Sequence, residues 1–249
     1  MKPYLSIIIP AYYEEHRIEK TLRESDKYLR SQKYDYEILV VNDGSKDKTA
    51  DVVKRLVSEI ANLRLIDNKI NQGKGSVVRQ GMLEAQGQFR LFMDADNSVS
   101  LDQVANFFPR LCGAKNAGSE CFDIVIGSIE VEGAKIEEQS QWYRRALGRF
   151  SKYLIRLISG LREIHDSQRG FKIFSEKAAL RIFPKQTIAR WGFDIEILLI
   201  AKRQGFKIKE VPVVWINPPE SKVTLKAYIK TFGELLKIKW NDIRGRYAQ

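Results

Sequence analysis

The sequence predicts an α/β fold with a mostly parallel central sheet flanked by helices. Over the first hundred residues, short β-branched runs alternate with segments of helical length, which is typical of βαβ units. Clusters of turn-forming residues stand where these runs end. The 249 residues are 44% hydrophobic, so the chain can bury one sizeable core.

The first half of the chain gives the regular part of this pattern. Residues 5–9 form a β-branched run that ends at Pro10, and residues 36–41 form a second run that ends at turn formers. Runs that are apolar on both faces are typical of buried parallel strands. We expect strands at residues 5–9, 36–41, 63–66 and 89–93, and helices at residues 14–30, 48–60 and 74–85.

The second half is less regular. Residues 142–161 and 223–244 place apolar side chains at helical spacing and basic side chains mostly on the other side, which predicts two amphipathic helices. No stretch resembles a linker, so we expect one domain over residues 1–222 and a C-terminal amphipathic helix within residues 223–249. The other expected elements are strands at residues 122–128, 170–174 and 207–214, a polar loop at residues 129–141 and a helix after Gly192.

The charge of the chain restricts its partners. A net charge of +11 and a pI near 9.5 favour nucleotide phosphates, nucleic acid or an acidic membrane surface. No apolar run approaches the roughly 18–20 residues of a bilayer span, so we expect no transmembrane helix. Cys112 and Cys121 are expected to be ordinary small hydrophobic residues in a reducing cytosol, because the sequence shows no signal segment.

Acidic residues follow the fourth expected strand. Asp94, Ala95 and Asp96 come directly after residues 89–93, and parallel sheets bind ligands at the carboxyl ends of their strands. Two carboxylates one residue apart can hold Mg²⁺ or Mn²⁺, which prefers few protein carboxylates together with phosphate oxygens and water. The triplet alone would more often be a solvated acidic turn. Because polar residues at two other strand ends are expected at the same edge, we favour a metal-binding role.

Further residues at this edge suggest a nucleotide. Asp43 can accept a hydrogen bond from the imide of uracil or from N1–H of guanine, and it can equally cap a turn. Gly73 to Ser76 precede a helix, so their backbone N–H groups and Lys74 can meet phosphate, although the spacing is not that of a P-loop. Lys74 alone would equally be a solvated lysine at a helix start.

The chain contains an ordered set of short motifs: Pro10-Ala11-Tyr12-x-Glu14-Glu15, Val40-Val41-Asn42-Asp43-Gly44-Ser45-x-Asp47-x-Thr49, Asn71-x-Gly73-Lys74-Gly75, Asp94-Ala95-Asp96, Asp166-Ser167-Gln168-x-Gly170-Phe171-Lys172-x-Phe174, Arg190-Trp191-x-Phe193-Asp194-x-Glu196 and Ser221-Lys222. Taken in order, these motifs resemble glycosyltransferase family 2, from about Leu5 to Lys222. Within the family they resemble the branch that transfers sugars to polyprenyl phosphates, and the later motifs are more similar to its dolichyl-phosphate glucosyltransferases than to its mannose synthases.

The resemblance implies a GT-A fold and an inverting transfer of a hexose to a polyprenyl or dolichyl phosphate. Glucose is the preferred sugar, UDP the preferred nucleotide and GDP the alternative. The implied cofactor is Mg²⁺ or Mn²⁺, held by Asp94 and Asp96, and Asp96 is expected to serve catalysis through this metal. Donor binding is expected from Pro10, Tyr12, Glu14, Val41, Asp43, Lys74, Asp94, Ala95 and Asp96.

The sequence departs from the family pattern at four positions. Tyr13 stands where asparagine is usual, and Asn42 stands where aspartate is usual. Ser98 occupies the place of a metal-binding glutamine of many mannose synthases, which leaves a third protein ligand in doubt. Ile129 replaces a common arginine, and Arg145 of the expected basic helix is its predicted substitute.

The acceptor decides whether a base is needed. A phosphate is already anionic near neutral pH, whereas a hydroxyl must lose a proton. Asp194, at the start of the helix after Gly192, is the candidate catalytic or orienting carboxylate. The basic helices suit a membrane surface, and we expect peripheral binding to the cytoplasmic face of a membrane. The candidate ligands of an acceptor phosphate are Arg145, Arg149, Lys172 and Lys222.

Besides a nucleotide-sugar-binding scaffold without catalysis, which would bind the donor without turnover, two other functions stay open from the sequence. One is a family 2 transferase that acts on a soluble or glycan hydroxyl, which would depend on Asp194 as a base. The other is a basic nucleic-acid-binding protein, suggested by the charge alone. Against the second, the chain has no recognisable nucleic-acid-binding motif and its carboxylates cluster at the expected site. We therefore expect a nucleotide sugar, a polyprenyl phosphate lipid and a membrane surface as partners and no nucleic acid; the oligomeric state is unknown.

Overall fold

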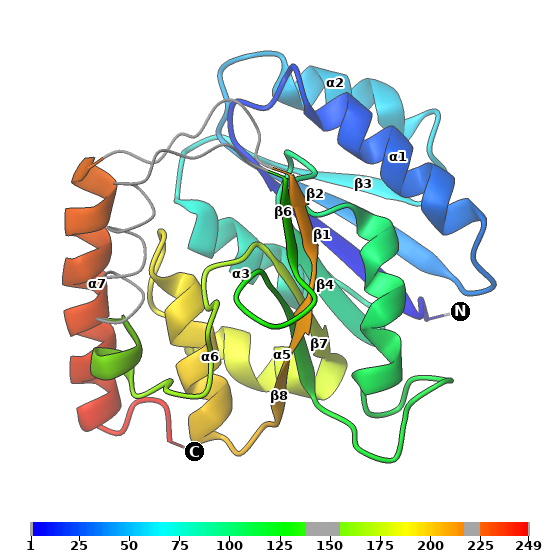
Figure 1. Cartoon of the computed structure of the whole chain (residues 1–249). Helices are drawn as coiled ribbons and strands as arrows, with labels where there is room; N and C mark the ends of the chain where they lie inside the picture. Colours follow the sequence, from blue (N-terminus) through cyan, green and yellow to red (C-terminus); the bar gives the residue numbers. More distant parts are fainter. Residues whose placement is uncertain (1, 138–154, 217–224, 249) are drawn as a thin grey trace.

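A seven-stranded sheet with helices on both faces forms the centre of the molecule (Figure 1). The structure is a computed structural model that describes residues 2–137, 155–216 and 225–248. The strands are β1 Leu5–Ala11, β2 Tyr36–Asp43, β3 Leu63–Asn68, β4 Phe89–Met93, β5 Ile124–Ser128, β6 Lys135–Glu137, β7 Phe171–Ser175, β8 Ile208–Pro212 and β9 Val214–Ile216. The α-helices are α1 Ile18–Arg30, α2 Thr49–Val57, α3 Lys74–Glu84, α5 Glu176–Ile182, α6 Phe193–Arg203 and α7 Leu225–Ile243, and the 3₁₀ helices are η1 Leu101–Asn106, η2 Phe108–Arg110 and η3 Phe183–Lys185.

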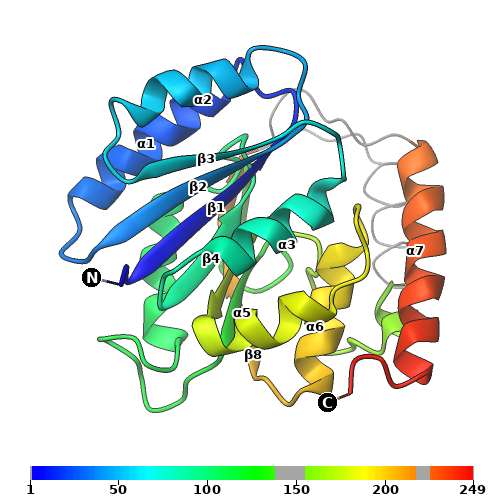
Figure 2. The same ribbon diagram turned by 180° about the vertical axis from the view of Figure 1, so that it is seen from behind.

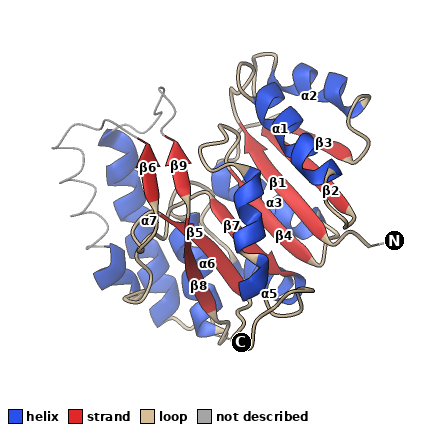
Figure 3. Ribbon diagram, turned by 45° about the vertical axis from the view of Figure 1, so that its right-hand side comes forward, coloured by secondary structure: helices blue, strands red, loops and turns tan. Residues whose placement is uncertain are grey.

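The sheet confirms the predicted α/β class and its mostly parallel character. Its strand order is β3-β2-β1-β4-β7-β5-β8 (Figure 3). The first four of these strands are mutually parallel, β7 runs antiparallel to both β4 and β5, and β5 is parallel to β8. Every residue of β1 is buried, including Pro10, which continues the strand instead of ending it. The carboxyl ends of β1, β2 and β4 therefore meet at one edge.

Two hydrophobic cores hold the helices on the sheet. On one face, α1 and α2 cover the strands through residues such as Leu22 and Val53. On the other face, α3, α5 and α6 pack through residues such as Val78, Ala179 and Leu198 (Figure 2). Helix α6 is buried from Phe193 to Ala201, which is why its sequence lacks a clear polar side. This burial fixes the residues at its start relative to the sheet edge.

In the C-terminal helix, the apolar residues expected on one buried face are divided between a buried and an exposed face. Leu235 and Ile238 enter the second core, but Phe232 and Leu236, expected on the same face, are exposed. Helix α7 lies beside α6, and Arg203 donates two hydrogen bonds of 2.6 and 2.7 Å to Asp242. The predicted division at residue 222 falls outside the described residues and stays a prediction.

The irregular second half departs most from expectation. The expected polar loop of residues 129–141 contains β6, which pairs with β9 in a separate two-stranded sheet. Helix α5 was not predicted, because its seven residues are too few for a periodic signal. Of the expected helix at residues 142–161, the described part begins at residue 155, and residues 155–159 are helical.

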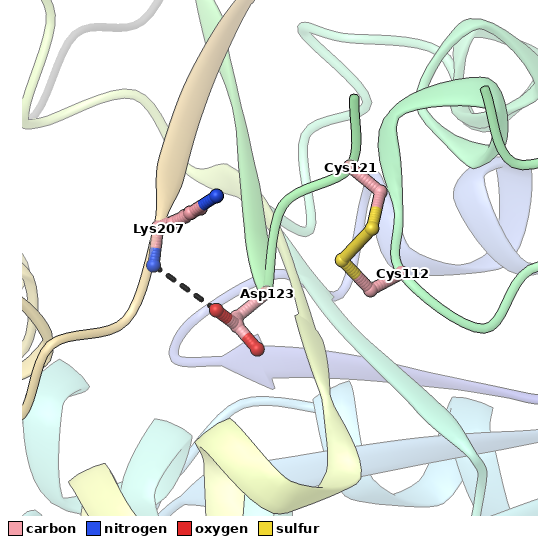
Figure 4. Close-up of a disulfide and its surroundings, with 4 residues drawn as sticks. All are labelled: Cys112, Cys121, Asp123 and Lys207. Carbon is pink, nitrogen blue, oxygen red and sulfur yellow. Dashed lines mark hydrogen bonds between the residues drawn. A yellow bond between two sulfur atoms is a disulfide. The ribbon is translucent and has the colours of Figure 1, made fainter. Parts of the chain in front are cut away.

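The prediction for the cysteines was wrong. Cys112 and Cys121 form a disulfide across the loop that leads into β5 (Figure 4). The backbone brings them together, because Cys112 N–H donates to the carbonyl of Phe122 at 3.0 Å. Next to them, Asp123 accepts a 3.0 Å hydrogen bond from the backbone N–H of Lys207, which joins the starts of β5 and β8. Disulfides are rare in reducing compartments, so the cysteines no longer support the expected cytosolic setting.

Across residues 2–137, 155–216 and 225–248, no helix combines the length and the apolar character needed to cross a bilayer.

Candidate active site

A pocket of about 510 Å³ opens at the carboxyl edge of β1, β2 and β4. Eight residues predicted to bind the donor line it: Pro10, Tyr12, Glu14, Asp43, Lys74, Asp94, Ala95 and Asp96. They come from four separate parts of the sequence, and the parallel topology brings them together. The ninth, Val41, is fully buried in the core under α3 and does not line the pocket.

Hydrogen bonds between loops shape the first wall of the pocket. The backbone N–H of Tyr13 donates to Ser45 Oγ at 3.0 Å, and that of Glu14 donates to Thr49 Oγ1 at 2.9 Å. Tyr13 has a φ of +56°, a left-handed conformation that asparagine adopts more readily than tyrosine. The asparagine expected from the family resemblance would fit the backbone at this position, and the two hydrogen bonds hold Tyr13 there instead.

The Asp43 carboxylate organises the loop before α3. It accepts hydrogen bonds from the backbone N–H groups of Gln72 at 2.7 Å and Gly73 at 3.0 Å, and from the Asn71 side chain at 2.8 Å. Burial raises the pKa of Asp43, and the two backbone hydrogen bonds oppose that rise. The carboxylate thus both faces the pocket and fixes the loop that carries Lys74.

Lys74 and Asp94 form an ion pair in the floor of the pocket. Lys74 Nζ lies 2.5 Å from Asp94 Oδ1 and 5.5 Å from the centre of the Trp191 ring. Burial works against the charged form of Lys74, but the carboxylates of Asp94, Asp194 and Asp96 outweigh it and raise the pKa overall. Lys74 is therefore a charged lysine at the site and not a solvated residue at a helix start.

Asp96 faces the same pocket from the turn after β4. Its Oδ1 accepts a 3.0 Å hydrogen bond from the backbone N–H of Ser98, and among the described residues Oδ2 has no hydrogen-bond partner. Thr21 Oγ1 donates to the carbonyl of Ala95 at 2.7 Å, which holds the turn on α1. Two carboxylates that open to one pocket fit Mg²⁺ or Mn²⁺, whose further ligands are phosphate and water. No group of three potential metal-binding side chains occurs in the described residues.

Gly170 lies against the Asp94 carboxylate, so a substitution at Gly170 can test the role of Asp94. A Cβ at this position would overlap all three atoms of that carboxyl group. The family resemblance implies that Asp94 holds a metal ion, so we expect Gly170→Ala to displace Asp94 and to lower the affinity for UDP in the presence of Mn²⁺ roughly 10–100-fold, the usual cost of disturbing the surroundings of a metal ligand. Calorimetric titration of UDP with Mn²⁺ measures it. Gly233→Ala is the control, since its Cβ would meet no atom within 4 Å. If Gly170→Ala bound UDP with the same affinity as wild type, the expected role of Asp94 would be contradicted.

A buried ion pair lies next to this pocket. Lys172 Nζ is 2.5 Å from Asp194 Oδ1 and 2.5 Å from the carbonyl of Arg169, and Lys172 has no exposed surface. Burial raises the pKa of Asp194, while the charges of Lys172 and Lys74 work against the rise. The structure therefore brings neither Lys172 nor Asp194 to the pocket surface. Lys172 cannot meet an acceptor phosphate there, because its ammonium group is already enclosed by protein acceptors.

The remaining predicted acceptor residues, Arg145, Arg149 and Lys222, lie outside the described residues. The pocket has other cations that were not predicted as site residues. Arg17 pairs with Glu14 at 2.7 Å, and Arg169 stacks 4.7 Å from the centre of the Trp215 ring. The pocket lining to which the sequence analysis assigned no donor, metal or acceptor side chain comprises Arg17, Gln168, Arg169, Arg190, Trp191 and Trp215 together with Ala11, Asn71, Gly73, Val77, Ser98 and Gly170.

The sequence could have identified some of these pocket residues but not others. Arg190 and Trp191 belong to a segment that carried the family resemblance, and their place directly before α6 was a usable signal. Arg17 and Trp215 had no such signal. Arg17 lies one residue before α1, and Trp215 belongs to β9, whose pairing with β6 joins residues far apart in the chain.

The fold and this pocket define a nucleotide-sugar glycosyltransferase of the GT-A class. Residues 6–183 match the model of Glycosyl transferase family 2, and the chain belongs to this family. A dolichyl-phosphate beta-glucosyltransferase of Trichomonas vaginalis is 36% identical over 240 residues, which are 94% of this chain and 72% of the relative. The predicted family and fold class are confirmed.

Two solved structures share the fold. One is glucosyl-3-phosphoglycerate synthase from Mycobacterium tuberculosis in complex with Mg²⁺ and UDP, with a TM-score of 0.65, 17% identity and coverage of 96% of this chain and 80% of that one. The other is a mannosyltransferase from Pyrobaculum calidifontis in complex with GDP-mannose and Mn²⁺. Its TM-score is 0.59 at 17% identity, with coverage of 98% of this chain and 64% of that one.

Proposed function

We propose that the chain transfers glucose from UDP-glucose to a polyprenyl phosphate of the dolichyl type, with inversion and with Mg²⁺ or Mn²⁺. The observation that carries this proposal is the meeting of Asp94, Asp96 and Lys74 with Tyr12 and Asp43 in one pocket. The proposal is further supported by the 36% identity to a dolichyl-phosphate beta-glucosyltransferase over nearly the whole chain.

The nucleoside is assigned to the wall formed by the loops after β1 and β2. Tyr12 is 41% exposed and offers a ring to a base, and the Asp43 carboxylate offers an acceptor to the imide of uracil. Pro10 and Glu14 complete this wall, and Val41 supports it from the core. The Asp43 carboxylate can accept a hydrogen bond from uracil or from guanine, so UDP is preferred over GDP only through the motif resemblance to dolichyl-phosphate glucosyltransferases.

The diphosphate is assigned to the floor of the pocket. Asp94 and Asp96 would hold Mg²⁺ or Mn²⁺, which neutralises the charge that develops on the diphosphate leaving group. Lys74 holds the Asp94 carboxylate in place at 2.5 Å and adds positive charge beside it. Such fixed charge stabilises a departing anion without reorganisation.

The acceptor phosphate attacks without a base. One of its anionic oxygens forms the bond to the anomeric carbon as the bond from that carbon to UDP breaks, and no proton needs to move. The enclosed position of Asp194 supports this route, because a base for a hydroxyl acceptor would have to reach the pocket. We assign Asp194 a positioning role: its carboxylate pairs with Lys172 at 2.5 Å, and its charge favours the charged form of Lys74. Arg169 and Arg190 of the pocket lining join Arg145, Arg149 and Lys222 as candidates for the acceptor phosphate.

A donor and acceptor screen tests the proposal. UDP-glucose, UDP-galactose and GDP-mannose are each incubated with polyprenyl phosphate or with soluble glycans, with Mn²⁺, Mg²⁺ or chelator, and lipid-linked sugar is measured. We expect transfer from UDP-glucose to the lipid that stops on chelation. Transfer to glycan hydroxyls alone would contradict the acceptor, and equal use of GDP-mannose would contradict the donor.

We also propose that the protein associates peripherally with a membrane, because a polyprenyl acceptor stays in the bilayer. The positive charge of the chain supports contact with an anionic surface.

A further inference from the structure

The face of α7 that points away from the protein is apolar. Leu235 and Ile238 on the inner face are buried, whereas four large apolar side chains on the opposite face are exposed. These four form the outer stripe: Phe232, Leu236, Trp240 and Ile243, which are 42%, 51%, 54% and 67% exposed. Their spacing of four, four and three residues places them on one line along the helix. Both views put α7 at the margin of the molecule (Figures 1 and 2).

Basic residues border the outer stripe on both sides. At 100° per residue, Lys230, Lys237 and Arg244 fall on one side of the line, and Lys239, whose Nζ lies 3.8 Å from Asp242 Oδ2, falls on the other. The Arg244 guanidinium lies 4.5 Å from the centre of the Trp240 ring, so the cation and the apolar residue share one surface. An apolar line with basic margins is the composition of a helix that lies in the interface of an anionic bilayer.

We propose that the outer stripe docks the protein on an anionic lipid bilayer. Phe232, Leu236, Trp240 and Ile243 would enter the boundary between headgroups and acyl chains, and the flanking cations would meet lipid phosphates. A second copy of the chain fits this face less well. A twofold pairing of α7 would bring the same basic margins of both copies close together, and like charges in such pairs repel.

The docking helix is joined directly to the pocket wall. Glu234 Oε2 accepts a 2.7 Å hydrogen bond from the backbone N–H of Gly192, the residue that follows the pocket residue Trp191. After α7, the hydroxyl of Tyr247 donates to Glu196 Oε1 of α6 at 2.7 Å. Docking through α7 would therefore hold the pocket at a fixed place relative to the bilayer. The choice of a membrane as the partner rests on the proposed lipid acceptor.

Vesicle flotation without donor, metal or acceptor tests the docking. Wild type is expected to bind phosphatidylcholine vesicles that contain phosphatidylserine, and to bind pure phosphatidylcholine less. The triple variant Phe232→Ser, Leu236→Ser, Trp240→Ser should have a vesicle partition coefficient at least about tenfold lower than that of wild type. A second triple variant, Lys237→Gln, Lys239→Gln, Arg244→Gln, should lose at least about tenfold as well. Leu180→Ser is the matched control, because Leu180 is a 47% exposed leucine on α5.

Three outcomes would overturn the inference. The first is equal vesicle binding by the folded triple variant and by wild type. The second is no binding by wild type. The third is a wild-type dimer in sedimentation equilibrium that the triple variant loses, which would assign the stripe to a second copy. Transfer to a short-chain polyprenyl phosphate dispersed in water should persist in the triple variant, so a failure of docking and a failure of the proposed reaction are separable.

Discussion

Asp96→Asn is expected to lower kcat/KM for transfer from UDP-glucose by at least about a hundredfold, or about 2.7 kcal/mol of transition-state stabilisation. Disturbing groups around a metal ligand already costs roughly 10–100-fold, and this change replaces a proposed ligand itself. The fold should be unaffected, because the asparagine oxygen can still accept from the Ser98 N–H.

The measurement is initial velocity over a range of Mn²⁺ and donor concentrations. Asp51→Asn is the matched control, since Asp51 is an exposed aspartate on α2. A variant whose rate and Mn²⁺ dependence equal those of wild type would refute the assignment of Asp96 to the metal diphosphate.

Lys172→Met is expected to have the largest effect on stability, a loss of about 3 kcal/mol in the free energy of unfolding. It would leave the Asp194 carboxylate buried without its partner at 2.5 Å, and breaking a buried pair in this way typically costs about 3–5 kcal/mol. The lower end applies because Lys74 also interacts with Asp194. Urea denaturation followed by circular dichroism measures the change.

A double variant separates charge from packing. Lys172→Met combined with Asp194→Leu removes both charges, so most of the lost stability should return. Lys202→Met is the surface control. It breaks the exposed pair with Glu163 and should cost less than about 1 kcal/mol. If the double variant is as unstable as the single variant, then the loss comes from packing of the Lys172 stem and not from an unpaired carboxylate.

Local patterns predicted the parallel half of the sheet well. Strand β4 begins and ends where expected, and β1, β2 and β3 differ only at their ends. Strands β1, β2 and β4 are buried on both faces, so their sequences are mostly apolar runs that can be recognised without knowing the neighbouring strand, whereas the edge strand β3 is only partly buried. The parallel order also explains why Asp43 and Asp94, far apart in the chain, could be placed at one edge in advance.

The partner of Lys172 could not be predicted from local patterns. In the sequence Lys172 is a lysine within a family motif and suggested a phosphate ligand. In the structure it belongs to β7, which enters the sheet antiparallel between β4 and β5. That placement turns Lys172 toward Asp194, 22 residues further on. A cation's partner is decided by which elements pack together, and neither periodicity nor spacing contains this information.

The sequence by itself determined the α/β class, the family and the residues that follow the parallel strands, because these depend on local apolar runs and on short motifs. The tertiary structure decided which of the predicted residues share a pocket. It also decided that Cys112 and Cys121 pair, that Asp194 is enclosed, and that the apolar residues of α7 divide between the core and the outer stripe. Each of these depends on contacts between segments far apart in the chain, whose geometry is fixed only when the elements pack.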